Sequence, residues 1–279
     1  RRRAKIYQQF HAHVNFWCRP LASCVPYARE ACRSGLESGD FLYAAYGAGT
    51  ELWSAFLSSQ DLAQFVDAYA PSVALIRKLK NQGFADATQL MLQWALALQG
   101  RTHGPLSLSG DGFEEEAYRR RYRDNAFFAS FHAVARLHLC SLLGTRAEAL
   151  AAARAAGATV HHVAGTVWPL THAFWHALAL AATHAGAGPQ EQAATRAQIG
   201  QARAYFALLA QNCPENFRCQ ALLLAAELAR IDGEGGIAIK FHEQAIEFAA
   251  QHPALLQLLA LAHELHGRLP LARGVPAVG

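Results

Sequence analysis

Charged residues are scarce in this sequence. Asp, Glu, Lys and Arg together make up 16% of its 279 residues, whereas a soluble domain typically has about 25%. Hydrophobic residues make up 52%, which excludes the low hydrophobicity of an intrinsically disordered chain. Much of this apolar content is alanine, the residue with the highest helix propensity. We therefore expect a folded, closely packed chain that is rich in helices.

A basic surface is also missing. The formal net charge is only +4, and three of the positive charges are the arginines at residues 1–3. The one short basic run elsewhere is RRRYR at residues 119–123, shortly after the acidic residues 114–116. This arrangement is typical of ion pairing along a helix surface. It argues against a nucleic-acid partner, which needs a basic face.

Signals for a membrane or a secreted protein are absent. The sequence has no continuous run of about 18 apolar residues, as a membrane-spanning helix needs, and no signal-peptide pattern at its N-terminus. None of its six cysteines has CxxC spacing, so we expect reduced thiols in a cytoplasmic protein without a membrane partner. Since the only methionine is Met91, we also expect the chain to be part of a longer protein.

Helical periodicity dominates, and strand-like alternation is nearly absent. Thr145 and Glu148 form a capping box, Asp40 is an expected N-cap, and Pro189 and Pro214 suit a first helical turn. The expected helices lie near residues 5–17, 21–37, 41–57, 60–80, 84–99, 113–123, 126–143, 146–156, 165–185, 189–211, 214–231, 235–250 and 254–266.

Alternate helix starts recur along the chain. Gly39, Gly83, Asn125, Gly165 and Pro214 follow one another at intervals of roughly 40 to 49 residues, close to the period of a two-helix repeat. Two segments, LLGTRAEALAAARAA and LARIDGEGGIAIKFHEQAIEFA, are similar to degenerate tetratricopeptide (TPR) repeats. Such units must stack to bury their apolar faces. The sequence therefore predicts an all-α fold, a TPR-like alpha-alpha superhelix of helical hairpins.

The longest irregular stretch is GRTHGPLSLSGDGF, residues 100–113. Its glycine, proline and serine content predicts a loop. Long loops can carry function, and an insertion between two repeats is the simpler interpretation.

The run NCPENFRC, residues 212–219, contains two cysteines. Cys213 and Cys219 are six residues apart, a spacing that fits neither a CxxC motif nor a facing pair on a helix. Cys213 suits a helix cap, while Pro214 and Glu215 suit the first helical turn. An apolar stripe at helical spacing follows, formed by Phe217, Ala221, Leu224, Ala225 and Leu228. We interpret the run as a helix start rather than a thiolate or metal site.

The 14 histidines suggest a metal site at only one place. His172 and His176 are four residues apart on an expected helix, which is a known metal-pair spacing, but no third ligand is evident among the aromatic residues around them. The segments HEQAI (242–246) and HELH (263–266) both lack the H-E-x-x-H zinc pattern. Packing histidines are therefore the preferred interpretation.

Motifs for catalysis are missing as well. GDGF (110–113) and GEGGI (233–237) lack the Lys and Ser/Thr of a phosphate-binding loop. The sequence has neither a G-x-S-x-G nucleophile elbow nor a kinase signature set. We expect no catalytic residue, no cofactor and no metal ligand in this chain.

One family resemblance runs through the sequence in order. NCPENF (212–217), followed by ALLLAAELARIDG and AIKFHEQAIEFA, resembles a segment of very large bacterial signalling kinases. SGLESGDFLYAAYGA (34–48), DGFEEEAYRRR (111–121) and the first 21 residues resemble earlier parts of the same region, so that most of residues 4–250 are covered. The match departs near residues 168–184, where HAFWHALALAATH replaces aromatic positions, and it fades after about residue 252.

The resemblance implies a place within a larger protein. In the family, a serine/threonine-kinase-like domain and an AAA/STAND-type predicted ATPase precede the helical repeats, and GAF and sensor histidine kinase modules follow. It implies that residues 1–252 are a TPR-like repeat domain and that residues 253–279 are a final helix and a ragged C-terminal end. No catalytic residue of the kinase or ATPase modules matches this chain.

The functional expectation is a non-catalytic regulatory or scaffold repeat domain. Its partners would be the other domains of the parent kinase, a protein partner or a small-molecule ligand, and its oligomeric state stays open. One alternative is a sensor that binds an apolar or aromatic ligand on the concave face, and another is a metal-dependent enzyme that uses the histidines. The candidate ligand- or partner-binding residues lie on the helices that open each repeat: Trp53, Gln89, Gln93, His132, Arg136, His172 and His176.

Overall fold

The computed structural model describes residues 2–58 and 61–272. Within these ranges the chain is all-α, as the periodicity predicts, and the only β-type pairing is an isolated bridge between Gly110 and Phe113. The α-helices are α1 (Arg2–His13), α2 (Cys24–Ser38), α3 (Phe41–Leu57), α4 (Leu62–Lys78), α5 (Gln82–Leu98), α6 (Glu115–Tyr122), α7 (Ala126–Leu143), α8 (Arg146–Gly157), α9 (Trp168–Thr183), α10 (Pro189–Asn212), α11 (Pro214–Ile231), α12 (Gly235–Ala250) and α13 (Leu256–Ala272). Short 3₁₀ helices are η1 (Asn15–Trp17), η2 (Leu21–Ser23), η3 (Val160–Val163), η4 (His184–Gly186) and η5 (Pro253–Leu255).

The helix boundaries follow the start signals of the sequence. Four predicted ranges coincide with α3, α7, α11 and α12. The Thr145 hydroxyl accepts the Glu148 N–H at 3.2 Å, and the Glu148 carboxylate accepts the Thr145 N–H at 2.8 Å, which confirms the capping box of α8. Pro189 and Pro214 occupy the first turns of α10 and α11, as expected. Asp40 holds the N-cap position of α3, but its side chain makes no capping hydrogen bond there.

The internal contacts divide the chain into two compact units, Arg1–His176 and Ala177–Gly279. The predicted domain boundary after residue 252 concerns the end of the repeat region and stays a prediction. In the second unit, α13 packs against α12 and also contacts α11, so this last helix shares a core with the two before it. Of the predicted irregular end, residues 273–279 lie outside the described residues.

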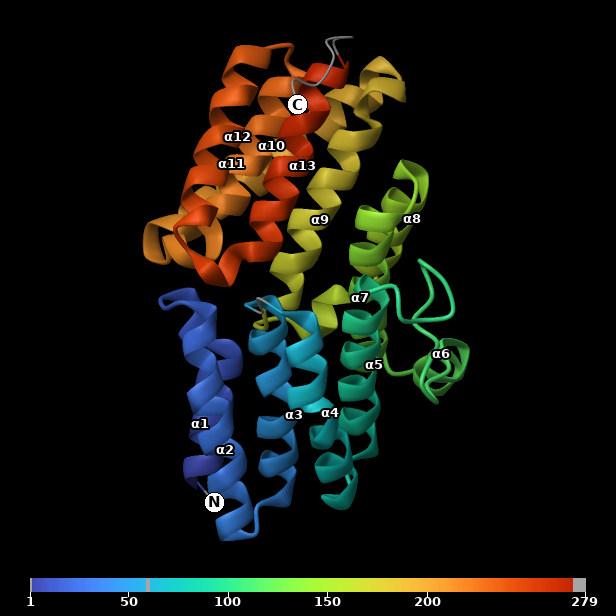
Figure 1. The fold of residues 1–279 in the computed structure, drawn as a ribbon, viewed down its shortest axis with the longest axis vertical. Helices are drawn as coiled ribbons and strands as arrows, with labels where there is room; N and C mark the ends of the chain where they lie inside the picture. The colour runs from blue at the N-terminus through green and yellow to red at the C-terminus, as the bar shows by residue number, and fades with distance from the viewer. Residues whose placement is uncertain (1, 59–60, 273–279) are drawn as a thin grey trace. The chain divides into compact units, whose positions relative to one another are not determined.

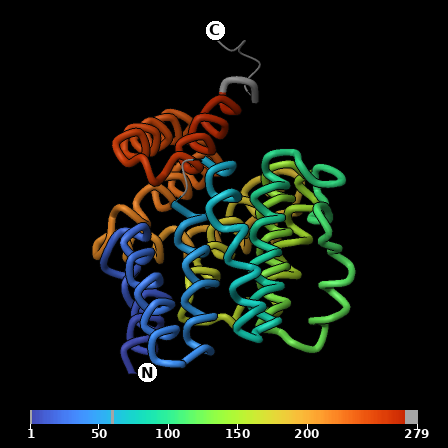
Figure 2. The backbone as a smooth tube through the Cα atoms, turned by 60° about the horizontal axis from the view of Figure 1, so that its bottom comes forward, coloured from blue at the N-terminus to red at the C-terminus, as the bar shows by residue number. Residues whose placement is uncertain are grey.

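Within the first unit, most helices pack against a neighbour along the chain. α1 packs on α2, α2 on α3, α3 on α4, α4 on α5, and α7 on α8. Alternate helices also touch, because α1 contacts α3, α3 contacts α5, and α5 contacts α7. Figure 1 and Figure 2 show the helices from α1 to α5 side by side, with successive helices running in opposite directions. The helices of this unit thus alternate between two layers.

Two glycines bring α2 and α3 unusually close together. A Cβ atom at Gly47 would lie 2.7 Å from the backbone nitrogen of Cys32 and 2.9 Å from the carbonyl oxygen of Ala28. At Gly35, a Cβ atom would lie 2.7 Å from the backbone nitrogen of Ala44. Because these neighbours are backbone atoms, a larger side chain at either position would have to separate the two helices.

An aromatic cluster forms the core between the two layers of the first unit. The Trp94 ring lies 4.7 Å from Phe56 and 5.8 Å from Trp168 between ring centroids. Trp168 in turn lies 6.1 Å from Phe131. Trp94 and Trp168 are each 1% exposed, so α3, α5, α7 and α9 share one continuous apolar interior.

The second unit is built in the same way from α10 to α13, in which α10 packs on α11, α11 on α12, and α12 on α13. The predicted apolar stripe of α11 faces this core, since four of its five residues are buried: Phe217, Ala221, Leu224 and Ala225. Glu227 is also buried, and its carboxylate is paired with the guanidinium of Arg230 at 2.7 Å. The charge at this position is therefore balanced inside its own helix.

One described helix, α7, is long and apolar enough to cross a membrane by length and composition alone. Of its 18 residues, 44% are buried within the protein, and the helix packs against α5, α6, α8 and η3. These contacts are those of a core helix. His132, Arg136 and His138 interrupt its apolar residues, which explains why the sequence contains no uninterrupted run of this length.

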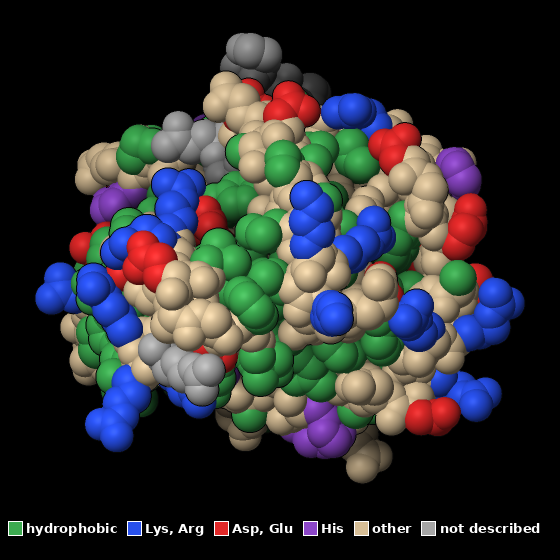
Figure 3. All heavy atoms as spheres, turned by 90° about the horizontal axis from the view of Figure 1, so that it is seen from below, with side chains coloured by type: hydrophobic (Ala, Val, Ile, Leu, Met, Phe, Trp, Pro, Cys, Tyr) green, Lys and Arg blue, Asp and Glu red, His purple; other side chains and the backbone are tan. Residues whose placement is uncertain are grey.

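The described surface mixes both signs of charge. Figure 3 shows one face, on which Lys and Arg side chains lie scattered among apolar and acidic ones. Within the basic run of α6, Arg119 pairs with Glu116 at 2.9 Å and Arg121 lies 3.5 Å from Asp86. The ion pairing expected along this helix surface is therefore present.

Candidate functional site

The irregular segment between α5 and α6 is a loop, as its composition predicts, and backbone hydrogen bonds join its two sides. The His103 N–H donates to the Ser109 carbonyl at 3.0 Å, and Gly110 and Phe113 exchange two backbone hydrogen bonds. The chain can turn this tightly because Gly110 and Gly112 have φ values of 157° and 76°, which a glycine adopts without steric cost. Asp111 also has a positive φ, of 48°.

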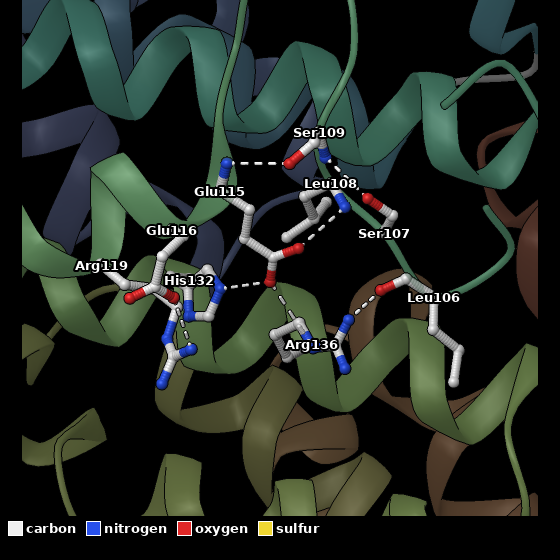
Figure 4. A network of polar contacts seen from close by, with 9 residues as sticks. All are labelled: Leu106, Ser107, Leu108, Ser109, Glu115, Glu116, Arg119, His132 and Arg136. Carbon is white, nitrogen blue, oxygen red and sulfur yellow. Dashed lines mark hydrogen bonds and ion pairs between the residues drawn. The ribbon is translucent and has the colours of Figure 1, made fainter. Parts of the chain in front are cut away.

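A carboxylate, a histidine and an arginine fix this loop to α7 (Figure 4). The Glu115 Oε1 atom lies 2.7 Å from His132 Nε2 and 3.7 Å from Arg136 Nε. The other oxygen, Oε2, accepts the Leu108 N–H at 3.0 Å. Arg136 also donates through Nη1 to the Leu106 carbonyl. We call Glu115, His132 and Arg136 the loop latch, because they join the loop backbone to one face of α7.

The charge of Glu115 is stabilised in this setting. Burial by itself raises the pKa of the carboxyl group, but hydrogen bonds from His132 and Leu108 and the positive charge of Arg136 outweigh it, so the net pKa lies below the ordinary value. The carboxylate thus stays ionised at neutral pH, and both of its oxygens are engaged in holding the loop. The geometry favours a positioning role over general acid or base chemistry.

Gln93 lies directly beneath the loop. Its side chain is 0% exposed, and neither its amide nitrogen nor its amide oxygen has a hydrogen-bond partner in the protein. A Cβ atom at Gly110 would lie 3.4 Å from the Gln93 Oε1 atom and 3.5 Å from the Thr102 Cα atom. Gly110 therefore lies close both to this amide and to Thr102 at the start of the loop. Gln89 lies one turn earlier on α5 and is half-buried.

Two tyrosines attach α6, and with it the end of the loop, to the helices beside it. The Tyr118 hydroxyl donates to the Phe128 carbonyl at 3.0 Å, and the Tyr122 hydroxyl donates to Asp86 at 2.7 Å. Burial raises the pKa of both hydroxyl groups, so they remain protonated donors. Glu115 shares this buried face of α6, since residues 115, 118 and 122 follow helical spacing.

The structure brings only some of the predicted binding residues together. Gln93, His132 and Arg136 gather around the loop, with Gln89 one turn away. Trp53 lies instead in the aromatic core, 6% exposed, with its ring 5.4 Å from Phe131 and 5.8 Å from Trp168. Its side chain therefore packs between helices.

The predicted histidine pair lies on α9 against α8. His172 donates through Nε2 to the Ala153 carbonyl at 2.9 Å, and the His176 ring centroid is 5.3 Å away from that of His172. Burial lowers the pKa of both imidazoles, which favours their neutral forms. Across residues 2–58 and 61–272, no three or more His, Cys, Asp or Glu side chains are grouped so that they could hold a metal ion.

The two cysteines of the NCPENFRC run are packing residues. Cys213 is the N-cap residue of α11 and is 1% exposed, and Cys219 is 0% exposed. Burial raises the pKa of Cys219 to about 12, so its thiol stays protonated. A reactive thiolate needs the opposite environment. The interpretation of this run as a helix start agrees with the geometry.

Glu115 is the latch residue that the sequence interpretation misses. Among its acidic neighbours it resembles an ordinary acid in a first helical turn. Its spacing to Tyr118 and Tyr122 is the signal that could place it on the inward face. In comparisons with known proteins, the chain matches no protein-family model, and no curated protein or solved structure matches it at a significant level.

Proposed function

We propose that this chain is a non-catalytic regulatory repeat domain of a cytoplasmic bacterial signalling kinase. In this role it couples the binding of a partner or ligand to neighbouring ATPase and histidine kinase modules. The family resemblance of residues 4–250 supplies the identity of the parent. The packing of the helices supplies a physical means of coupling partner binding to the neighbouring modules.

The observation that carries the proposal is the order of the helix contacts. Most helices pack against the next helix in the chain, and several also contact the next but one, such as α1 with α3 and α11 with α13. This resembles the contact pattern of a stacked repeat protein, in which units touch mainly their neighbours, although Trp168 of α9 also packs on Trp53 of α3 and Trp94 of α5. It supports the finer assignment of a TPR-like superhelix of helical hairpins.

Such a stack can transmit a signal mechanically. A small rotation at one helix pair would pass to the next, because successive helices pack on one another. The coupling requires that the partner bind one arrangement of the helices more tightly than another. The close approach of α2 and α3 at Gly47 makes their relative position sensitive to small changes in packing.

The size of the native protein tests the proposed parent. An antibody raised against this chain should detect a polypeptide far larger than 30.3 kDa in the source cells. Deleting residues 41–250 from that polypeptide should change its signalling output. A single band near the mass of this chain, or a deletion without effect on signalling, would refute the proposal.

A further inference from the structure

The boundary between the two compact units falls inside a helix. The first unit ends at His176 and the second begins at Ala177, whereas α9 runs without a break from Trp168 to Thr183 (Figure 1). Such boundaries usually lie in exposed linkers that are rich in proline, glycine or polar residues. Residues 170–183 contain neither glycine nor proline, so this segment lacks the residues that usually kink or break a helix.

The first half of α9 is fixed within the first unit. Trp168 is 1% exposed and packs in the aromatic core. One turn later, His172 donates to the Ala153 carbonyl of α8 at 2.9 Å. The centroid of the Trp175 ring lies 4.6 Å from that of His138 on α7. Because these contacts follow one another along α9, they fix the rotation of the helix about its own axis as well as its position.

The second half of α9 is fixed within the second unit. The carbonyl groups in the last turn of a helix have no partner inside that helix. Arg230 of α11 donates to the Ala181 carbonyl at 2.8 Å. Just beyond the helix, Gln192 of α10 donates to the His184 carbonyl at 3.2 Å. Two helices of the second unit therefore hold the end of α9.

We propose that α9 is a coupling helix, a stiff element that belongs to both units and passes a rotation or shift of the first unit on to the second. Backbone hydrogen bonds fasten every turn of a helix, so a helical connection is a semi-rigid spacer, whereas a glycine-rich one is a flexible coil. Rigid elements of this kind carry energetic coupling between distant parts of a protein. A rotation of the first unit turns α9, and the turned helix displaces the groups bonded to Ala181 and His184.

Pulsed electron paramagnetic resonance with two spin labels tests the coupling on the full chain. One label is attached to Cys18, which is exposed in the first unit, and the other to Lys240→Cys, at an exposed position in the second. With its natural α9, the chain should give one narrow distribution of distances between the labels. Three glycines inserted between His176 and Ala177 should widen this distribution roughly twofold or more, because the two halves of α9 then turn independently.

The matched control places the same three glycines between Ala187 and Gly188, in the connection that precedes α10. This insertion leaves α9 continuous, so the width of the distribution should stay that of the natural chain. Circular dichroism and tryptophan fluorescence check that each protein is folded. If the insertion in α9 prevents folding, the milder pair His176→Gly with Ala177→Gly takes its place.

A broad distribution for the chain with its natural α9 would overturn the coupling. Equal widths for the natural chain and for the variant with an interrupted α9 would overturn it as well. The coupling rests on the proposed regulatory function only for its use in signalling. Either negative result leaves that function standing, because it is tested on the mass and signalling of the parent protein.

Discussion

At the scale of single residues, burial decides which groups react and which titrate. Four of the six cysteines are buried and Cys32 is half-buried, whereas Cys18 is exposed. Burial raises the pKa of the thiols of Cys24, Cys32, Cys140 and Cys219. The environment of each thiol is thus sufficient to rank its reactivity.

This ranking predicts the outcome of thiol labelling. A thiol reagent such as Ellman's reagent should quickly modify about one thiol per native chain, because Cys18 is the one cysteine whose side chain is exposed to the reagent. Denaturation should expose all six. Cys18→Ser should abolish the fast phase. A fast phase that survives this substitution would show that Cys213 or another buried thiol is accessible after all.

Buried histidines predict a loss of stability in acid. Burial lowers the pKa of His138 to about 3, and burial together with the nearby His13 lowers that of His11 to about 3. Below pH 6.5 the unfolded chain binds protons that the folded chain does not. The free energy of unfolding should therefore fall as pH drops from 6.5 towards 3, by about 1.4 kcal/mol per pH unit for each histidine.

All five tryptophans lie within residues 1–176, so their fluorescence during denaturant unfolding reports on the unit that holds both histidines. His138→Leu should remove its share of the pH slope, about 1.4 kcal/mol per pH unit. His162→Gln, at an exposed position, should leave the slope unchanged. Equal slopes for wild type and His138→Leu would contradict the assignment of His138 as a buried neutral group.

At the scale of helices, the close packing of α2 on α3 makes a sharper prediction. Gly47→Ala places a methyl group 2.7 Å from the Cys32 backbone nitrogen, so it should lower the free energy of unfolding by about 1–3 kcal/mol. Gly200 lies inside α10, and a methyl group added there would meet nothing within 4 Å. Gly200→Ala should raise stability by about 0.5–1 kcal/mol, through helix propensity alone.

Circular dichroism during denaturant unfolding measures both glycine variants, since it reports on helices in either unit. The informative result is that the two substitutions change the free energy of unfolding in opposite directions. If both substitutions stabilised the protein, the two helices would not be in the close contact described, and helix propensity alone would account for the data.

The helices also show what sequence can and cannot predict. The predicted ranges of α3, α7, α11 and α12 match the structure to the residue. At α7, for example, the Asn125 side chain accepts the Phe128 N–H, so this signal acts within the local backbone. The latch depends on contacts between residues far apart in sequence. His132 and Arg136 are predicted binding residues, but their pairing with Glu115 depends on the path of the loop, which the backbone angles at Gly110, Asp111 and Gly112 set.

Trp53 shows a second limit of prediction from the sequence. Its position on a helix that opens a repeat is a reason to predict an inner, ligand-facing surface. Its burial depends on α7 and α9, whose aromatic rings surround it. Periodicity identifies the face of a helix but not which partner covers that face, so core and binding surface could not be told apart from the sequence at this position.

At the scale of the whole molecule, we propose that the packing of these helices regulates the histidine kinase module of a larger parent protein. The stack has its own cores in both units, and its helices contact mainly their neighbours in the chain. Under the proposed function, a change of packing in α2 and α3 should alter the output of the parent protein.

The most direct test is the autophosphorylation rate of the full-length parent protein, measured with radiolabelled ATP for wild type, Gly47→Ala and Gly200→Ala. We predict a several-fold change for Gly47→Ala, which shifts helix packing, and a wild-type rate for Gly200→Ala. Equal rates for all three proteins, at a temperature where each is folded, would contradict a regulatory role for the repeat region.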